Sequence, residues 1–188
     1  VESISIPGTG WNCVVHARHI DDIFKNIRDM ITGKIKKCQP LRYWLRGFKG
    51  SIEVETDAKT GKTKEYYVGK YIFDVETNVL KITELPIGVC SQNYVEGTEK
   101  AKKSKLKTQN SGIRYDPMVV ESEVFDRSQD DTIDIQIKLV EGAADAIANM
   151  KNKNGTYKYG GKDPFIEYFR LKEAINHHIN FINEKGEV

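Results

Sequence analysis

The sequence predicts an α+β fold in which a mostly antiparallel sheet carries flanking helices on one side. Three observations lead to this prediction. Asp131–Val140 alternates apolar and polar residues with the period of two that marks a half-buried strand. Ser51–Leu85 contains β-rich runs separated by short turn sequences. Ile20–Ile31 carries apolar residues at helical spacing.

The N-terminal helix is predicted from its apolar spacing and from signals at both of its ends. Asp21 or Asp22 can occupy the first turn, where a carboxylate interacts favourably with the helix dipole, and Gly33 can stop the helix. Pro40 and Gly47 then interrupt the chain. The apolar residues that recur at intervals of three and four are Ile20, Ile23, Phe24, Ile27, Met30 and Ile31.

The middle of the chain predicts a meander of three antiparallel strands. Its strands are Ser51–Thr56, Tyr66–Val75 and Val79–Leu85. Asp57–Lys62 contains Gly and polar residues, which are typical of the tip of a hairpin, and the second connection is Glu76–Asn78.

The second half of the chain is expected to contain one strand and two short helices. In Asp131–Val140 the apolar residues Ile133, Ile135, Ile137 and Leu139 face one way. The other expectations are a polar, lysine-rich loop over Glu96–Gly112, helices over Ala143–Lys151 and Pro164–Leu171, a Gly/Asn/Lys loop over Asn152–Lys162 and a turn at Glu184–Gly186.

Length and composition predict a globular protein. The 188 residues suffice to bury a core, and 39% hydrophobic with 30% charged residues is not the composition of a disordered chain. No apolar run reaches the ~18–20 residues that a membrane span needs, and no signal peptide is visible. The missing initial Met suggests a piece of something longer. Cys13, Cys38 and Cys90 are odd in number and far apart, which favours free thiols in a reducing, intracellular compartment.

Basic residues gather in two segments although the net charge is only +2. Tyr43, Trp44 and Phe48 are interleaved with the first segment, where aromatic rings can hold a loop while Arg and Lys reach phosphates. This pattern favours nucleic-acid binding. The alternatives are ordinary solvated loops, or a scaffold module whose basic faces meet acidic protein partners. The two sets are Lys34, Lys36, Lys37, Arg42, Arg46 and Lys49, and then Lys100, Lys102, Lys103, Lys105 and Lys107.

Signals for covalent chemistry or for metal binding are missing from the sequence. His177 and His178 are adjacent, so on a strand they would point to opposite faces and could not share one ion. No other His or Cys spacing supports a metal site. Gly8–Gly10 is not followed by the Lys-Ser/Thr of a phosphate loop, and no His lies in a triad pattern. We therefore expect no catalytic residue and no cofactor in this segment.

Four sequence motifs, in order, resemble those of type IIA DNA topoisomerases of the eukaryotic and large-DNA-virus branch. Ser5–Asn12 resembles the Gly-Ile-Gly-Thr-Gly-Trp-Ser motif of that family, and His19–Arg28 resembles the helix that follows it. Arg46–Glu53 resembles Arg-Gly-aromatic-x-Gly-Thr-Ile-Glu, and Lys81–Pro86 matches Ile-Thr-Glu-Leu-Pro. Asp131–Leu139, Phe165–Leu171 and Ile179–Gly186 then fall where the family has a strand, a Phe-x-Leu segment and a final hairpin.

The resemblance implies the tower, or shoulder, region of the DNA-cleavage core. Residues 1–18 would end the winged-helix and cleavage region, and residues 19–188 would form the tower domain. The family carries an Ile before Gly-Thr-Gly-Trp that wedges between base pairs. Here Pro7 holds that position and Ile6 precedes it, so the resemblance implies Pro7, ahead of Ile6, as the DNA-intercalating residue. Residues that would approach DNA beside the wedge are Gly8, Thr9, Gly10 and Trp11.

The resemblance also implies what the parent enzyme needs and meets. Its catalytic Tyr, its acidic Mg²⁺ site and its ATPase domain lie outside this stretch, so ATP and Mg²⁺ belong to the parent and not to this segment. The implied partners are double-stranded DNA, the rest of the topoisomerase chain and a second copy of the parent, with no membrane. A viral parent would act in the host cytoplasm or nucleus.

Overall fold

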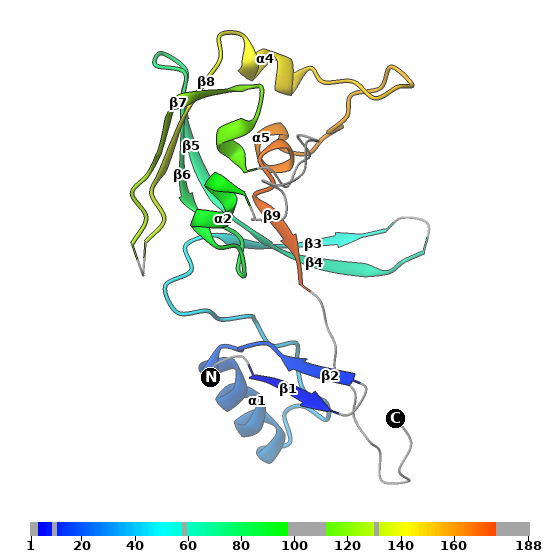
Figure 1. Ribbon diagram of the computed structural model, residues 1–188. Coiled ribbons are helices and arrows are strands. Elements are labelled where there is room, and N and C mark those ends of the chain that lie inside the picture. The colour runs from blue at the N-terminus through cyan, green and yellow to red at the C-terminus, as the bar shows by residue number, and fades with distance from the viewer. Residues whose placement is uncertain (1–3, 9–10, 58–59, 98–111, 130–131, 176–188) are drawn as a thin grey trace. The chain divides into compact units, whose positions relative to one another are not determined.

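The computed structural model describes residues 4–8, 11–57, 60–97, 112–129 and 132–175. Its contacts divide the chain into two compact units, of which unit 1 holds Val1–Gly47 and Asn176–Val188 and unit 2 holds Phe48–Ile175 (Figure 1). This division falls after Gly47. The resemblance implies a boundary after residue 18, which separates two regions of the family's enzyme rather than two compact units. That boundary stays a prediction.

Unit 1 contains a β-hairpin and the predicted helix. Strands β1 (Ile4–Gly8) and β2 (Trp11–Val15) pair antiparallel, from Ile4 opposite Val15 to Gly8 opposite Trp11. Helix α1 (Ile20–Ile31) has the predicted bounds. It ends where Gly33 adopts a φ of +70°, a left-handed conformation that glycine adopts at little cost.

Unit 2 contains two antiparallel sheets. Strands β3 (Ser51–Thr56), β4 (Thr63–Val68) and β9 (Lys172–Ala174) form a sheet in the order β3-β4-β9. Strands β5 (Lys70–Asp74), β6 (Val79–Glu84), β8 (Ile135–Leu139) and β7 (Val119–Asp126) form a second sheet in the order β5-β6-β8-β7. All of these pairings are antiparallel, as predicted.

The core of unit 2 lies between the four-stranded sheet and short helices on one of its faces (Figure 1). In β8, Ile135, Ile137 and Leu139 are buried, which confirms the predicted alternation. They pack with residues from the helical side, among them Ile147 and Phe169. The helices on that side are α2 (Ser91–Glu96), η1 (Ile113–Tyr115), α4 (Ala143–Ala148) and α5 (Pro164–Tyr168).

Helix α5 begins at a sequence signal that fixes its place on the sheet. Asp163 is its N-cap, and one carboxylate oxygen accepts hydrogen bonds from the backbone N–H groups of Phe165 (2.9 Å) and Ile166 (3.2 Å). The other oxygen accepts a 2.7 Å bond from the Tyr71 hydroxyl of β5. Pro164 follows in the first turn, where its missing N–H costs nothing. The Asp-Pro pair therefore both starts the helix and ties it to the sheet.

The predicted three-stranded meander is wrong, because its middle strand is divided at Gly69. Residues before Gly69 form β4 of one sheet, and residues after it form β5 of the other. The Gly69 N–H donates to the Leu171 carbonyl at 2.7 Å, and a Cβ at this position would collide with the Glu84 carbonyl oxygen. The chain can change sheets here because glycine leaves room for a second backbone.

Other sequence expectations are confirmed in part. The hairpin at Asp57–Lys62 and the turn at Glu76–Asn78 are present, and the helices at Ala143 and Pro164 end three residues earlier than predicted. Helix α2 and strand β7 were not predicted, and they lie between the motif Lys81–Pro86 and the strand expected at Asp131–Leu139. Most of the expected Glu96–Gly112 loop and the whole Glu184–Gly186 turn lie outside the described residues.

Candidate nucleic-acid interface

The two residues predicted to wedge into DNA lie on β1, next to the end of the β1–β2 ribbon. Pro7 is opposite Asn12, and Ile6 is opposite Cys13. In a ribbon of two strands each strand is an edge, where proline is tolerated because its missing N–H need not face the partner. Gly8 and Trp11 form the last pair of the ladder, and the predicted DNA-binding residues Thr9 and Gly10, which connect them, lie outside the described residues.

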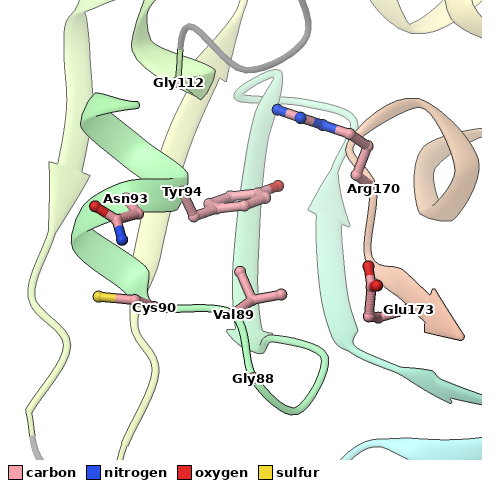
Figure 2. Close-up of a pocket in the computed structure, with 8 residues that line it drawn as sticks. All are labelled: Gly88, Val89, Cys90, Asn93, Tyr94, Gly112, Arg170 and Glu173. Atoms are coloured by element: carbon pink, nitrogen blue, oxygen red, sulfur yellow. The ribbon is translucent and has the colours of Figure 1, made fainter. Parts of the chain in front are cut away.

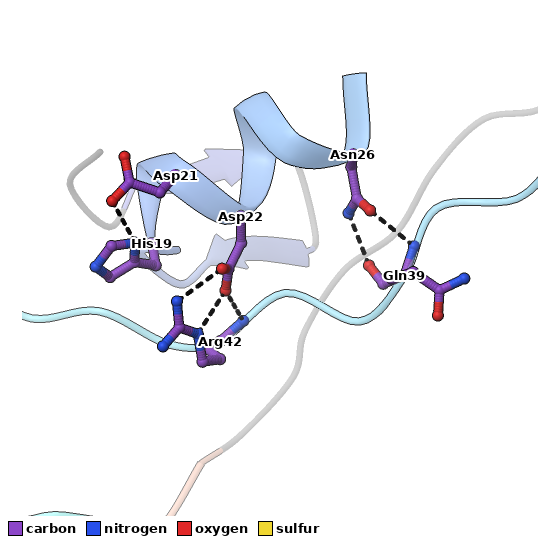
Figure 3. Close-up of polar contacts among 6 residues, drawn as sticks. All are labelled: His19, Asp21, Asp22, Asn26, Gln39 and Arg42. Atoms are coloured by element: carbon purple, nitrogen blue, oxygen red, sulfur yellow. Dashed lines mark hydrogen bonds and ion pairs between the residues drawn. The ribbon is translucent and has the colours of Figure 1, made fainter. Parts of the chain in front are cut away.

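Arg42, one of the predicted DNA-binding residues, is bound to the helix in unit 1. Its Nε and Nη2 atoms each donate a 2.7 Å hydrogen bond to a different oxygen of Asp22, and its backbone N–H donates a third bond of 3.3 Å (Figure 3). This fork is the geometry in which Arg binds a carboxylate most strongly. The Arg42 guanidinium, by hydrogen bonding to Asp22, lowers the pKa of that carboxyl to about 2. Arg42 thus anchors the loop to α1.

A buried amide holds the same loop one turn further along α1. Asn26 donates through Nδ2 to the Gln39 carbonyl at 2.9 Å and accepts from the Gln39 N–H at 3.1 Å (Figure 3). Its side chain therefore satisfies both backbone groups of Gln39, as one strand of a sheet would do for another. Asn26 is the buried polar residue of the described part, and this pairing explains why its burial is tolerated.

Two aromatic residues of the basic segment contact the residues that precede α1, although Trp44 stays exposed. Tyr43 is bridged to Arg18, whose guanidinium carbon lies 3.7 Å from the Tyr43 ring centroid. The backbone N–H of Trp44 donates to the Ala17 carbonyl at 3.1 Å, and the Trp44 ring meets the His19 ring edge-on. A cation above an aromatic face is attracted by the ring quadrupole. The Arg18–Tyr43 contact therefore adds to the Trp44–Ala17 hydrogen bond in holding the loop.

The remaining basic residues of the segment expose their charged groups. In unit 1 no acidic side chain of the described part pairs with Lys36, Lys37 or Arg46, and Lys34 is 3.8 Å from Asp29, a distance typical of a weak surface pair. Lys49 is also exposed, but it belongs to unit 2. Lys36, Lys37 and Arg46 are therefore the unit 1 groups best suited to reach phosphates. The predicted residues Lys100, Lys102, Lys103 and Lys105 lie outside the described residues.

Two of the family-like motifs meet within unit 2. The Glu84 carboxylate, from Lys81–Pro86, accepts the Lys49 N–H at 2.9 Å, and Lys49 lies in Arg46–Glu53. Next to it, a Cβ on Gly50 would collide with the Val68 carbonyl and the Phe48 ring. Glu84 of one motif therefore binds the backbone of the other motif, and Gly50 leaves room for the backbone at Val68 to approach. This role of Glu84 was not predicted from the sequence.

A charged network lies on one face of the β3-β4-β9 sheet. Lys172 of β9 donates to Glu53 at 2.7 Å and to Glu55 at 2.8 Å, and its Nζ lies 4.6 Å from the Tyr66 ring centroid. Lys162 also reaches Glu55, at 2.8 Å. Hydrogen bonds from these two lysines lower the pKa of Glu55 to about 2. The network joins β9 to β3 across β4, and the side chain of Lys172 is only 9% exposed.

A pocket of about 440 Å³ opens between α2 and the segment that leads into β9 (Figure 2). Tyr94 of α2 forms one wall, and its hydroxyl donates to the Phe169 carbonyl at 2.8 Å. Arg170, which adopts a φ of +53°, extends toward the pocket from the other side. No nucleophile–base pair is formed by its lining, which consists of Gly88, Val89, Cys90, Asn93, Tyr94, Gly112, Arg170 and Glu173.

Neither a metal centre nor a membrane span is present in the part of the chain that the structure describes. Over these residues no group of three or more His, Cys, Asp or Glu side chains is placed to hold an ion, and no helix has the length and apolar character to cross a bilayer. His177 and His178 lie outside the described residues. Cys38 and Cys90 are exposed free thiols.

Comparisons with known proteins agree with the resemblance to type II DNA topoisomerases. DNA topoisomerase 2 of African swine fever virus is 24% identical over 197 residues, which cover 97% of this chain and 14% of the viral protein. DNA topoisomerase 2 of Pisum sativum is 30% identical over 133 residues, which cover 70% of this chain and 8% of the plant protein. The chain thus spans about a seventh of the length of the viral relatives it matches.

The fold has a counterpart among solved structures. The DNA-binding, cleavage and re-ligation domain of Plasmodium falciparum topoisomerase II superimposes with a TM-score of 0.61 at 22% identity, over 92% of this chain and 19% of the other. The α+β architecture expected from the sequence is therefore a known one. The family model for the A-type subunit of DNA gyrase and topoisomerase IV matches residues 6–159. Since this match extends over most of the chain, the chain belongs to that family of type II DNA topoisomerases.

Proposed function

We propose that this chain is the segment of an ATP-dependent type II DNA topoisomerase that binds and bends the duplex which the parent enzyme cuts. The observation that carries the proposal is the β1–β2 ribbon, which ends beside Pro7 in the motif that resembles the family's wedge. An apolar residue that enters a base step unstacks it and kinks the duplex, and the glycines beside it let the backbone approach the groove.

Phosphate contacts supply the free energy for this bend. Bending a site of ~20–30 base pairs smoothly costs on the order of 1–6 kcal/mol, which several Lys or Arg contacts to phosphates can offset. Lys36, Lys37 and Arg46 are exposed and available for such contacts, whereas Arg42 is bound to Asp22. The segment therefore positions DNA, and it reads no bases.

The chemistry of strand cleavage is assigned to other parts of the parent. In this proposal a tyrosine elsewhere in the parent attacks the bent duplex, Mg²⁺ is held by acidic residues outside this segment, and ATP drives passage of a second duplex through the break. The parent acts as a homodimer on double-stranded DNA. The segment contributes geometry, since bending presents the scissile phosphates to the tyrosine.

Pro7 is the residue to test in the full-length parent. We expect Pro7→Gly to reduce DNA bending, measured by fluorescence transfer between the ends of a short duplex, and to reduce cleavage in parallel. Ile6→Gly is the matched control, because consecutive positions of a strand serve opposite faces and only one of them can enter the base step. Bending that survives Pro7→Gly and is lost with Ile6→Gly would assign the wedge to Ile6. Loss in neither variant would contradict a wedge in this ribbon.

Salt dependence separates DNA binding from the scaffold alternative. If several phosphates are contacted, the logarithm of the affinity for random duplex DNA falls linearly with the logarithm of salt concentration, by about 0.9 for each phosphate neutralised. A scaffold that binds acidic proteins would show no such dependence toward DNA. Absence of DNA binding by the folded chain at low salt would favour the scaffold.

A further inference from the structure

The pocket between α2 and the segment that leads into β9 carries two opposite charges on one side. Arg170 and Glu173 both belong to that segment and both line the pocket, whose volume is about 440 Å³ (Figure 2). Small-molecule sites in proteins have volumes of ~300–1,000 Å³, so the pocket is large enough for a small ligand. All of its lining residues belong to unit 2, so it lies within one compact unit.

Arg170 has a backbone conformation that an arginine rarely adopts. It follows α5 at a φ of +53°, and the next N–H, that of Leu171, donates to the Ile166 carbonyl at 2.9 Å. Glycine is the usual residue at such a helix end, because a Cβ at positive φ crowds the backbone. In the described part the other non-glycine residue with a positive φ is Asn78, and asparagine tolerates this conformation better. Unfavourable backbone that directs a charged group toward a pocket points to a function for that group.

Neither of the two charges is neutralised by a neighbour. Over the described residues, Arg170 and Glu173 form no ion pair and no side-chain hydrogen bond, with each other or with another residue. The guanidinium has five N–H donors and no acceptor, whereas the carboxylate has acceptors and no donor. A ligand that satisfies both residues must therefore bring an acceptor to Arg170 and a donor to Glu173.

The opposite side of the pocket is rigid and apolar. Tyr94 is buried, and its hydroxyl donates to the Phe169 carbonyl at 2.8 Å. This bond ties α2 to the end of α5 directly before Arg170, so the pocket is formed by the fold before any ligand enters. A preformed site loses little free energy to ordering when it binds. The Tyr94 ring and the half-buried Val89 supply the apolar part of the lining.

We infer that this pocket binds a small zwitterion with an apolar side chain, of the size and charge of a free aliphatic amino acid. The carboxylate of the ligand accepts hydrogen bonds from Arg170, whose planar fork matches a carboxylate. Its ammonium group donates to Glu173, and its side chain lies against Val89 and Tyr94. One ligand thus satisfies both charges and covers the apolar lining.

Glu173 selects against ligands that carry phosphate groups. A nucleotide or a DNA phosphate would be attracted by Arg170, but its further negative charges would lie in the same pocket as the Glu173 carboxylate, and like charges in one site repel. A simple amine would be repelled by Arg170 for the same reason. The site is therefore separate from DNA binding by the β1–β2 ribbon, and its test does not depend on the proposed function.

Cys90 allows occupancy of the pocket to be measured at the site itself, because it lines the pocket and is an exposed free thiol. In the full-length parent, maleimide labelling of Cys90 is followed by peptide-level mass spectrometry as L-leucine is added. Cys38, an exposed thiol of unit 1, is the internal control. We expect L-leucine to slow the labelling of Cys90 in proportion to occupancy and to leave Cys38 unchanged.

Three further probes test the two charges of the ligand. 4-Methylpentanoate lacks the ammonium group, leucinamide lacks the carboxylate, and inorganic phosphate lacks both the ammonium group and the side chain. We expect each to protect Cys90 at least about tenfold less well than L-leucine, because each leaves a charged group of the pocket without its hydrogen bonds. No protection at millimolar L-leucine would overturn the inference. Equal protection by phosphate would also overturn it and would make the pocket a simple anion site.

Arg170→Gly separates binding from folding. Glycine adopts a positive φ at little cost, so the melting temperature should stay equal or rise, while the L-leucine concentration that protects half of Cys90 should rise at least about tenfold. Glu173→Gln should weaken L-leucine and bring it closer to 4-methylpentanoate. Arg127→Gln is the matched control, because Arg127 is an exposed arginine outside the pocket, and it should leave protection unchanged. Protection that survives in both pocket variants would overturn the assignment of Arg170 and Glu173.

Discussion

Arg42 illustrates how a basic residue in a basic segment can form a structural contact that the sequence does not show. From sequence it is equivalent to Lys36 and Arg46, because charge runs reveal only composition. In the folded chain its fork is bound by Asp22, 20 residues earlier. Sequence alone identifies Asp22 only as a first-turn acid of the helix. The sequence signal that could have linked the two is an acidic residue in the first turn of a helix and an Arg shortly after Pro40, where the chain can turn back toward that helix.

The Asp22–Arg42 pair predicts two separate effects of basic-to-alanine changes. We expect Lys36→Ala or Arg46→Ala to reduce the salt slope of DNA binding by about 0.9 for each phosphate that is no longer neutralised, with little change in melting temperature. Arg42→Ala should do the reverse, lowering the melting temperature and leaving the slope unchanged, because its guanidinium is engaged by Asp22. The measurements are duplex affinity at several salt concentrations and thermal unfolding. A reduced slope in Arg42→Ala would show that Arg42 leaves Asp22 for a phosphate.

Strands with a clear period of two were predictable, whereas their ends and their sheets were not. β8 and β3 follow from residue alternation, which depends on local geometry alone. The division of Tyr66–Val75 depends on Gly69, whose neighbours Glu84 and Leu171 are distant in sequence. No local pattern reports that a strand must leave its sheet. Helix α2 was missed for a related reason, since its buried Tyr94 and Val95 pack on long-range partners.

The junction at Gly69 predicts a large effect for a single methyl group. Gly69→Ala would drive a Cβ into the Glu84 carbonyl oxygen, and overpacking of this kind costs about 1–3 kcal/mol of unfolding free energy. Gly160→Ala is the matched control, because its Cβ would meet only the Tyr157 carbonyl at 3.7 Å. Chemical denaturation followed by circular dichroism measures both. Equal unfolding free energies for the two variants would mean that the backbone at Gly69 can move away from Glu84 without loss of stability.

At the scale of the whole molecule, the motif order identified the family but could not place the charges. The four motifs are short and local, so they survive as readable sequence, and two of them meet at Glu84 and Lys49. The first basic segment, which reads as one cluster, is divided between unit 1 and unit 2 after Gly47. The wedge stays a prediction that rests on the position of Pro7 in a motif. Pro7 lies in the β1–β2 ribbon, which was not predicted from the sequence of Ser5–Asn12.

The Lys172 network predicts how the stability of unit 2 depends on pH. The folded-state pKa of Glu55 is about 2, against 4.5 for a free Glu, so its carboxylate stabilises the fold fully above about pH 4.5 and loses this contribution as pH falls toward 2. Glu55→Gln should therefore lower the melting temperature by a few degrees at pH 7 and by almost nothing at pH 2. Glu76→Gln serves as the control and should track the original protein throughout, because Glu76 is exposed and forms no ion pair with the described residues. A gap in melting temperature that stays constant from pH 7 to pH 2 would mean that Glu55 acts through packing and not through its charge.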